Sequence, residues 1–188
     1  MTKVRCDWCN NSEIYVKYHD EEWGVPEYDD QKLFEMLVLE SFQAGLNWLT
    51  ILKKRENFKS AFDDFNYEMI SKYTEMKISK LLKNEGIIRH RGKIEATVQN
   101  ARSFMKVQEE FGSFSTFIWS YVDDRPKINS FKNLDQVPTQ TELSQRISEN
   151  LKKRGFKFLG PTTVYAFMQA TGLVNDHVIY CFKHKKSA

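Results

Sequence analysis

The most apolar run of the chain, residues 33–52, holds one acid close to its middle, Glu40. At helical spacing Glu40 falls on the same side as Leu33, Leu37 and Ala44, so the acid lies on the apolar stripe of the predicted helix. An ionised carboxylate on a buried face is costly unless it is paired or hydrogen-bonded. Two interpretations stay open from this run. Either Glu40 tilts out to solvent or pairs with a core arginine, or it binds a flat, electron-poor or cationic group among aromatic rings.

Hydrophobic periodicity and breaker residues predict an all-α fold. We expect helices at about 30–44, 47–62, 67–84, 92–111, 112–122, 141–154 and 161–171, and a loop over 123–138. Residues 1–28 are expected to be irregular, and no stretch alternates for long enough to predict a strand. A chain of 188 residues suits one domain, 1–188, in two lobes, with terminal segments 1–28 and 172–188.

Charge and cysteine content narrow the class of protein. The net charge is +3, and the positive side chains cluster at 52–56, 89–93, 151–157 and 183–186. Such clusters either line a phosphate-binding face or are solvated helix ends. No apolar run is long enough to span a membrane and the N-terminus lacks a signal-peptide core, so we expect a cytoplasmic protein without a membrane partner. Three cysteines in that compartment favour metal binding or chemistry over disulfides.

Residues 151–172 read as a helix, a glycine-bounded turn and a second helix. Gly155 suits the left-handed end of the first helix, and Gly160 lets the backbone come close to a ligand. Pro161 suits the first position of the next helix, whose free amides and dipole form an anion site. The segment resembles the helix-hairpin-helix motif of DNA repair glycosylases, which grips the DNA backbone without reading sequence. A generic corner between two helices is the alternative.

The residues after the hairpin depart from that superfamily. Its endonuclease III-like members follow the hairpin helix with V-D-x-H, in which the Asp is catalytic. This chain has Val174-Asn175-Asp176-His177. Asn175 therefore stands where the superfamily has its Asp, and Asp176, one residue later on a helix, is expected to point elsewhere. The usual mechanism does not carry over, which returns the search for an acid to Glu40.

Four side chains from the two ends of the chain are candidate metal ligands. His177 and Cys181 are four residues apart and share a face if the segment is helical. Cys6 and His19 supply another thiolate and imidazole, which completes a tetrahedral zinc site joining the termini. Cys9, in a C-x-x-C pair with Cys6, and His184 are rival ligands, and a metal-free C-x-x-C and buried His is the alternative.

Further segments carry a more specific resemblance: RCDW, YHDEEWGVP, LFEMLVLESFQAGLNWLTILKKRE, GIIRHRGKI, LKKRGFKFLG and GLVNDHVIYC. Over nearly the whole chain they resemble the 3-methyladenine DNA glycosylase I family. That resemblance implies an all-α, helix-hairpin-helix fold and one structural zinc ion held by Cys6, His19, His177 and Cys181. Cys9 is not a family ligand.

The same resemblance implies a base pocket. Glu40 is expected to hydrogen-bond the base edge, while Tyr18 and Trp48 stack on the base faces. Further pocket aromatics are expected at Trp8, Tyr15 and Trp23, and Leu46 is expected to plug the opened strand. The hairpin residues expected to contact DNA are Gly155, Phe156, Lys157, Gly160 and Thr162.

The implied reaction is hydrolysis of the N-glycosidic bond of 3-methyladenine in alkylated double-stranded DNA by a monofunctional, monomeric enzyme that leaves an abasic site. N3-alkylation already activates the leaving base, so Glu40 is expected to recognise the base rather than act as a strong general base. The alternatives are a non-catalytic DNA-binding module with a zinc clip, a glycosylase or lyase for another lesion, and an aromatic cage for a quaternary ammonium. A lyase is disfavoured because Lys157 has no Asp at the expected place.

Overall fold

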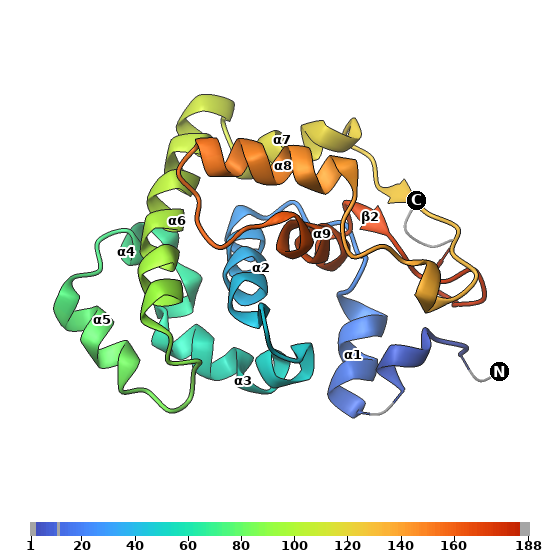
Figure 1. Cartoon of the computed structure of the whole chain (residues 1–188), viewed down its shortest axis with the longest axis horizontal. Helices are drawn as coiled ribbons and strands as arrows, with labels where there is room; N and C mark the ends of the chain where they lie inside the picture. Colours follow the sequence, from blue (N-terminus) through green and yellow to red (C-terminus); the bar gives the residue numbers. More distant parts are fainter. Residues whose placement is uncertain (1–2, 11, 185–188) are drawn as a thin grey trace.

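The computed structural model describes residues 3–10 and 12–184, and its elements are mostly helical (Figure 1). The helices are α1 (Glu13–Glu21), α2 (Asp30–Gln43), α3 (Trp48–Ala61), α4 (Tyr67–Ile70), α5 (Glu75–Leu82), α6 (Arg91–Phe111), α7 (Phe114–Trp119), α8 (Glu142–Lys153) and α9 (Pro161–Ala170). The strands β1 (Lys127–Ile128) and β2 (Val174–Asn175) pair in parallel. Single 3₁₀ turns lie at Asp7–Cys9, Asp63–Phe65, Ser120–Val122 and Leu134–Gln136.

Helix α2 is the central element, with α6 on one side of it and α9 on the other (Figure 1). The side chain of Asp29 accepts a hydrogen bond from the Lys32 amide at 2.9 Å and caps its start. Gly45, with φ of +84°, follows its end. The predicted helix over 30–44 is therefore confirmed. Burial in α2 extends beyond its apolar stripe, since Phe42 is buried as fully as Leu33 and Leu37, and all three are at most 1% exposed.

The predicted helix over 67–84 is wrong in one respect, because the structure divides it into α4 and α5. Tertiary hydrogen bonds replace the helical ones at the break. Arg102 Nε donates to the carbonyl of Ser71 at 2.8 Å, and the hydroxyl of Tyr73 donates to Asp63 at 2.6 Å. Since these partners lie elsewhere in the chain, local periodicity does not reveal the break.

The sequence predicts that residues 1–28 are irregular. This prediction is wrong in part, because the segment contains α1. Tyr15, Tyr18 and His19 form the buried face of this helix. Because that face is aromatic and polar instead of aliphatic, the helical pattern is weak. The predicted absence of strands also needs correction: β1 lies in the expected 123–138 loop and pairs Lys127 with Val174 and Ile128 with Asn175.

The two described ends of the chain lie on the same side of the molecule, at the right of Figure 1. The amide of Phe182 donates to the carbonyl of Val4 at 2.9 Å, and the amide of Gly24 donates to the carbonyl of Gln169 at 2.9 Å. The terminal segments thus hold each other against α9. Among the described residues, no helix is long and apolar enough to cross a membrane.

Candidate active site

A cavity of about 320 Å³ opens between the N-terminal segment, α2, α3 and α9. That volume is near the lower end of the range for small-ligand sites. Its walls combine aromatic rings with a few polar groups: Trp8, Tyr15, Tyr18, Trp23, Glu40, Gln43, Trp48, Leu134, Val137, Ala166, Gln169 and Asp176. Glu40 and all five aromatic residues expected at a base pocket therefore meet in one place.

Glu40 lies in the wall of this cavity with only 4% of its surface exposed. Its Oε2 atom has no hydrogen-bond partner among the described residues. Burial raises the pKa of Glu40 to about 8. The nearby cations bind elsewhere: Arg55 pairs with Glu22 and Glu35, and Lys93 donates to backbone carbonyls. The interpretation that Glu40 tilts out to solvent or pairs with a core arginine is excluded.

The aromatic side chains of the wall are held by one another and by α3. The Trp8 ring lies edge-on to Tyr15 at 5.3 Å and to Trp23 at 5.2 Å between centroids. The Tyr15 hydroxyl donates to Asn47 Oδ1 at 3.1 Å and accepts from the Leu49 amide at 2.9 Å. This pair of bonds fixes α1 against the first turn of α3. The cavity wall is therefore built from groups that lie far apart in sequence.

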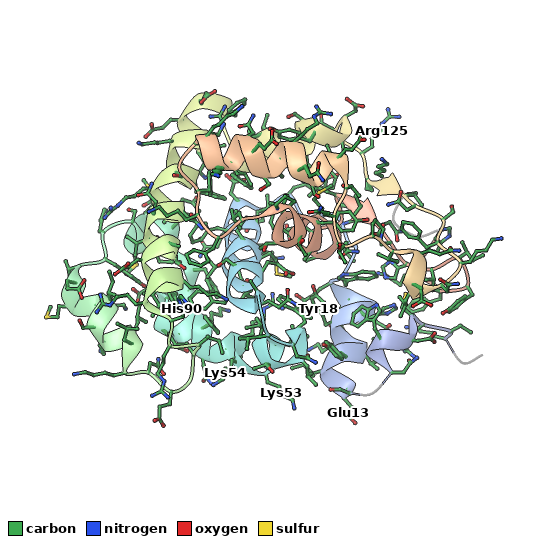
Figure 2. The ribbon with its side chains drawn as sticks, viewed as in Figure 1. Glu13, Tyr18, Lys53, Lys54, His90 and Arg125 are labelled. Carbon is green, nitrogen blue, oxygen red and sulfur yellow. The ribbon has the colours of Figure 1, made fainter. Side chains whose placement is uncertain are left out.

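Tyr18 points from α1 toward the centre of the molecule, whereas Glu13 lies at the outer end of the same helix (Figure 2). The Tyr18 and Trp48 rings are 5.6 Å apart between centroids and tilted by 51°. A base stacked between two rings needs about 7 Å, twice the ordinary ~3.5 Å van der Waals separation. The two rings contact each other here, so a base enters between them only after one ring moves.

Two polar cavity residues were missed in the sequence. Asp176 was expected to point elsewhere, but it lies in the cavity wall with Gln169. Asp176 Oδ2 accepts from the Tyr165 hydroxyl at 2.5 Å and from Gln169 Nε2 at 2.8 Å, and Oδ1 accepts from Asn129 at 2.7 Å. The expectation rested on a helix after position 174, and the structure has β2 and turns instead. Glu40 is therefore not the sole carboxylate of the site.

Ligand atoms of Cys6, His19 and Cys181 lie within 4.8 Å of one another and can hold a metal ion. All three side chains are buried, and the cysteines are free of disulfides. His19 Nε2 is 3.4 Å from Cys181 Sγ. A hydrogen bond from Cys6 and the proximity of His19 hold the pKa of the Cys181 thiol below its usual range. Two sulfurs and an imidazole are a donor set that suits zinc.

His177 lies beside this group. The sequence predicts a helix for the segment that carries it, but the structure has no helix there. Its ring centroid is 4.9 Å from that of His19. Asn175 donates from Nδ2 to the His184 carbonyl at 3.1 Å, so its Oδ1 faces His177 Nδ1 at 2.8 Å. Burial lowers the pKa of His177 to about 3. The ring is thus neutral with its proton on Nδ1, and Nε2 is buried without a partner among the described residues.

Groups around the ligands hold them in place. His19 Nδ1 lies 2.9 Å from Asp20 Oδ1, and Arg5 donates twice to the Asp20 carboxylate at 2.8 Å. Carboxylate–histidine pairs of this kind orient metal-binding imidazoles. The two other candidate ligands, Cys9 and His184, contact backbone carbonyls instead. Cys9 Sγ donates to the Cys6 carbonyl at 3.1 Å, and His184 Nε2 lies 3.0 Å from the carbonyl of Asn129.

The turn between α8 and α9 has the local geometry expected from its glycines. Gly155 has φ of +90°, and Pro161 begins α9. Asn100 of α6 binds the turn on both sides of Lys157, accepting from its amide at 2.7 Å and donating to its carbonyl at 3.0 Å. Phe156, expected at the DNA, is 4% exposed and packs into the core near Phe114. Its side chain therefore anchors the turn in the core.

The α2–α3 turn presents Leu46 at the surface, 41% exposed, after the left-handed Gly45. Lys93, which belongs to the basic cluster 89–93, is buried beneath it. Lys93 Nζ donates to the carbonyls of Phe42 at 2.9 Å and Ala44 at 2.8 Å, and so caps the end of α2. One member of that cluster therefore supports a turn and does not line a phosphate-binding face.

Comparison with known proteins identifies the family. The model of the methyladenine glycosylase family matches residues 8–184. The DNA-3-methyladenine glycosylase of Haemophilus influenzae is 50% identical over 178 residues, which cover 95% of this chain and 96% of the relative. DNA-3-methyladenine glycosylase 1 of Escherichia coli is 48% identical over 177 residues, which cover 94% of this chain and 95% of the relative. A structure of 3-methyladenine DNA glycosylase I from Staphylococcus aureus has a TM-score of 0.92 at 41% identity and covers 96% of each chain. The chain therefore belongs to the methyladenine glycosylase family.

Proposed function

We propose that this protein hydrolyses the N-glycosidic bond of 3-methyladenine in alkylated double-stranded DNA and leaves an abasic site. The observation that carries the proposal is Glu40, a buried acid with a free oxygen in a cavity walled by aromatic rings. Membership of the methyladenine glycosylase family and relatives named for this activity support it.

The chemistry of the substrate fits this cavity. Alkylation at N3 gives the base a positive charge, which favours the ionised form of a nearby Glu40 and is attracted by aromatic faces. Water adds to C1′ of the sugar while the C1′–N9 electron pair moves to the base, which leaves as neutral 3-methyladenine. The water proton passes to solvent. Because the leaving group is activated, Glu40 recognises the base edge and no strong base is required.

Extrusion of the nucleotide costs a few kcal/mol. Stacking on aromatic rings returns roughly 1–3 kcal/mol for each base contact. In this proposal Trp48 swings away from Tyr18, and the base occupies the space between them. Trp8, Tyr15 and Trp23 support these rings and keep water away from the base.

DNA contacts are proposed at two turns. At the α8–α9 hairpin, Lys157, Gly160 and Thr162 are exposed, and Gly155 shapes the turn in a helix-hairpin-helix arrangement. Gly160 has an ordinary φ of −68°, and a Cβ added there would meet nothing within 4 Å. The protein itself does not require glycine here, but a closely approaching phosphate does. Leu46 fills the space that the extruded base leaves.

A structural zinc ion is proposed at Cys6, His19, His177 and Cys181. The orphaned Nε2 of His177 and the two buried thiols supply the support. Four protein ligands leave no open position for a reactive water, so the ion contributes stability and joins the terminal segments of a single 1–188 domain. We expect a monomer.

The test is incubation of the protein with methylated duplex DNA and identification of the released bases. We expect 3-methyladenine from the parent protein and a large loss of its single-turnover release rate in Glu40→Gln. Binding of the DNA without any released base would indicate a non-catalytic module instead. Strand cleavage through a trapped covalent adduct would indicate a lyase.

A further inference from the structure

The side-chain amide of Gln169 has an orientation that its neighbours impose. Its Nε2 lies 2.8 Å from Asp176 Oδ2, which also accepts from the Tyr165 hydroxyl at 2.5 Å. Asn129 donates to the other oxygen of Asp176 at 2.7 Å. A carboxylate surrounded by three donors can only accept at these contacts. The NH₂ end of Gln169 must therefore face Asp176.

The carbonyl end of the same amide points away from Asp176. The structure gives Gln169 Oε1 no hydrogen bond within the part of the chain that it describes, and Gln169 belongs to the cavity wall. Ala166, one turn earlier on α9, is a small residue of the same wall. The backbone carbonyl of Gln169 is held by the Gly24 amide at 2.9 Å. The Oε1 atom of this wall residue is therefore an acceptor without a bond among the described residues, in addition to Glu40 Oε2.

A fixed acceptor distinguishes the two purines at position 6. Adenine carries an amino group there, which donates, whereas guanine carries an oxygen, which only accepts. A carbonyl oxygen that faces this position accepts a hydrogen bond from the amino group of adenine. Opposite guanine the same oxygen is unpaired and is repelled by the guanine oxygen.

We propose that Gln169 is a specificity-determining residue: its side-chain oxygen accepts a hydrogen bond from the 6-amino group of alkylated adenine, and Asp176 holds the amide in the orientation that disfavours alkylated guanine. The inference rests on the proposed assignment of this cavity as the base pocket.

The first experiment compares the release of two bases from the same methylated duplex DNA. Gln169→Leu keeps the size of the side chain but removes the acceptor. We expect single-turnover release of 3-methyladenine to fall about 3- to 10-fold, the usual effect of one hydrogen bond. Release of 3-methylguanine should fall less or rise, so the adenine-to-guanine ratio drops. An equal loss for both bases would overturn the proposal, because a merely structural role predicts it.

The second variant tests the part played by Asp176. Asp176→Asn keeps the size of that side chain and lets the Gln169 amide turn its NH₂ group into the cavity. We expect the adenine-to-guanine ratio to drop further than in Gln169→Leu, since a donor then faces position 6. Gln145→Leu, an exposed glutamine on α8, is the matched control and should leave the ratio unchanged. An unchanged ratio in Asp176→Asn would show that Asp176 does not orient the amide.

A binding measurement keeps the test independent of turnover. Free 3-methyladenine is titrated while tryptophan fluorescence is followed, since Trp8, Trp23 and Trp48 lie in the cavity wall. Gln169→Leu should weaken binding by the same 3- to 10-fold, and parent-like binding would overturn the proposal. Glu40→Gln distinguishes a failure of the cavity assignment from a failure of the role proposed for Gln169. If it too leaves binding and excision unchanged, the cavity assignment is wrong; if it alone reduces them, only the role of Gln169 is wrong.

Discussion

Asn175 Oδ1 lies 2.8 Å from His177 Nδ1, while the Nδ2 atom of the same side chain donates to the carbonyl of His184. From the resemblance noted in the sequence, a catalytic Asp is expected at position 175, but Asn175 contacts the ring of His177, beside Cys6, His19 and Cys181. The donated hydrogen bond requires an amide, because a carboxylate has no N–H group. The amide at position 175 thus has a physical reason in this chain.

Asn175→Asp is expected to destabilise the protein by about 1–3 kcal/mol, because a fully buried carboxylate oxygen would replace the donor opposite the His184 carbonyl. Urea denaturation measures the change. Asn133→Asp, the same substitution at an exposed site, is the control and should change stability little. Equal effects of the two variants would contradict the role assigned to Asn175.

Protein purified without added metal is expected to contain one zinc ion per chain. A strong chelator should lower the melting temperature, and Cys181→Ser should lose both the zinc and the chelator effect. Elemental analysis and a thermal melt with and without chelator are the measurements. A metal-free protein whose melting temperature ignores the chelator would rule out the four-ligand site.

Gly24→Ala is expected to weaken zinc binding by about 10- to 100-fold, the usual range for changes next to metal ligands. Gly24 has φ of +72°, and a Cβ added there would lie 2.7 Å from His177 Cε1. Gly112→Ala is the matched control, with φ of +85° and nothing within 4 Å of the added Cβ. Both variants share the backbone strain, so only crowding of His177 separates them in a competition assay with a zinc-binding dye.

The stability of the parent protein relative to Glu40→Gln should fall as pH rises from about 4.5 to about 8 and level off above. The pKa of Glu40 is raised in the folded state, so the folded protein holds a proton that the unfolded chain has already released in this interval. The total change is on the order of a few kcal/mol. Urea titrations of both proteins across this range would detect it, and parallel pH profiles would contradict it.

Lys93→Met is expected to cost about 1–3 kcal/mol of stability and to slow excision from duplex DNA. The substitution leaves the buried carbonyls of Phe42 and Ala44 unpaired and loosens the turn that carries Leu46. Lys53→Met, an exposed position on α3 (Figure 2), is the control for stability. Denaturation midpoints and single-turnover rates are compared. Unchanged stability in Lys93→Met would contradict the capping role.

Glu40 could be selected from the sequence as an acid on an apolar stripe between aromatic-rich segments, whereas the individual aromatic residues of the cavity were implied by the family resemblance. The prediction of helices such as α2 rested on local signals, the Asp29 cap and Gly45, that the structure retains. Asp176 and Gln169 were not predictable in this way. Asp176 is brought to the wall by the segment after β2, where it contacts Gln169 of α9, and hydrophobic periodicity does not indicate such a contact.

The candidate metal ligands could likewise be predicted only in part from the sequence. Cys6, His19 and Cys181 could be selected by residue type, and the structure brings them together. The helical spacing expected for His177 and Cys181 was wrong, since neither residue lies in a helix. Residue chemistry therefore identified the ligands, whereas the backbone that brings them together is stabilised by long-range contacts, such as the hydrogen bond from the Asn129 amide to the Asn175 carbonyl at 3.0 Å.

The contact between His19 and Cys181 joins residues 162 positions apart in the chain. Helices α1 to α8 are synthesised before the segment that carries His177 and Cys181. Until then the cavity lacks its wall at Asp176. The cavity around Glu40 is thus completed only when the segment after α9 meets the N-terminal segment, so closing it depends on contacts between residues far apart in the chain.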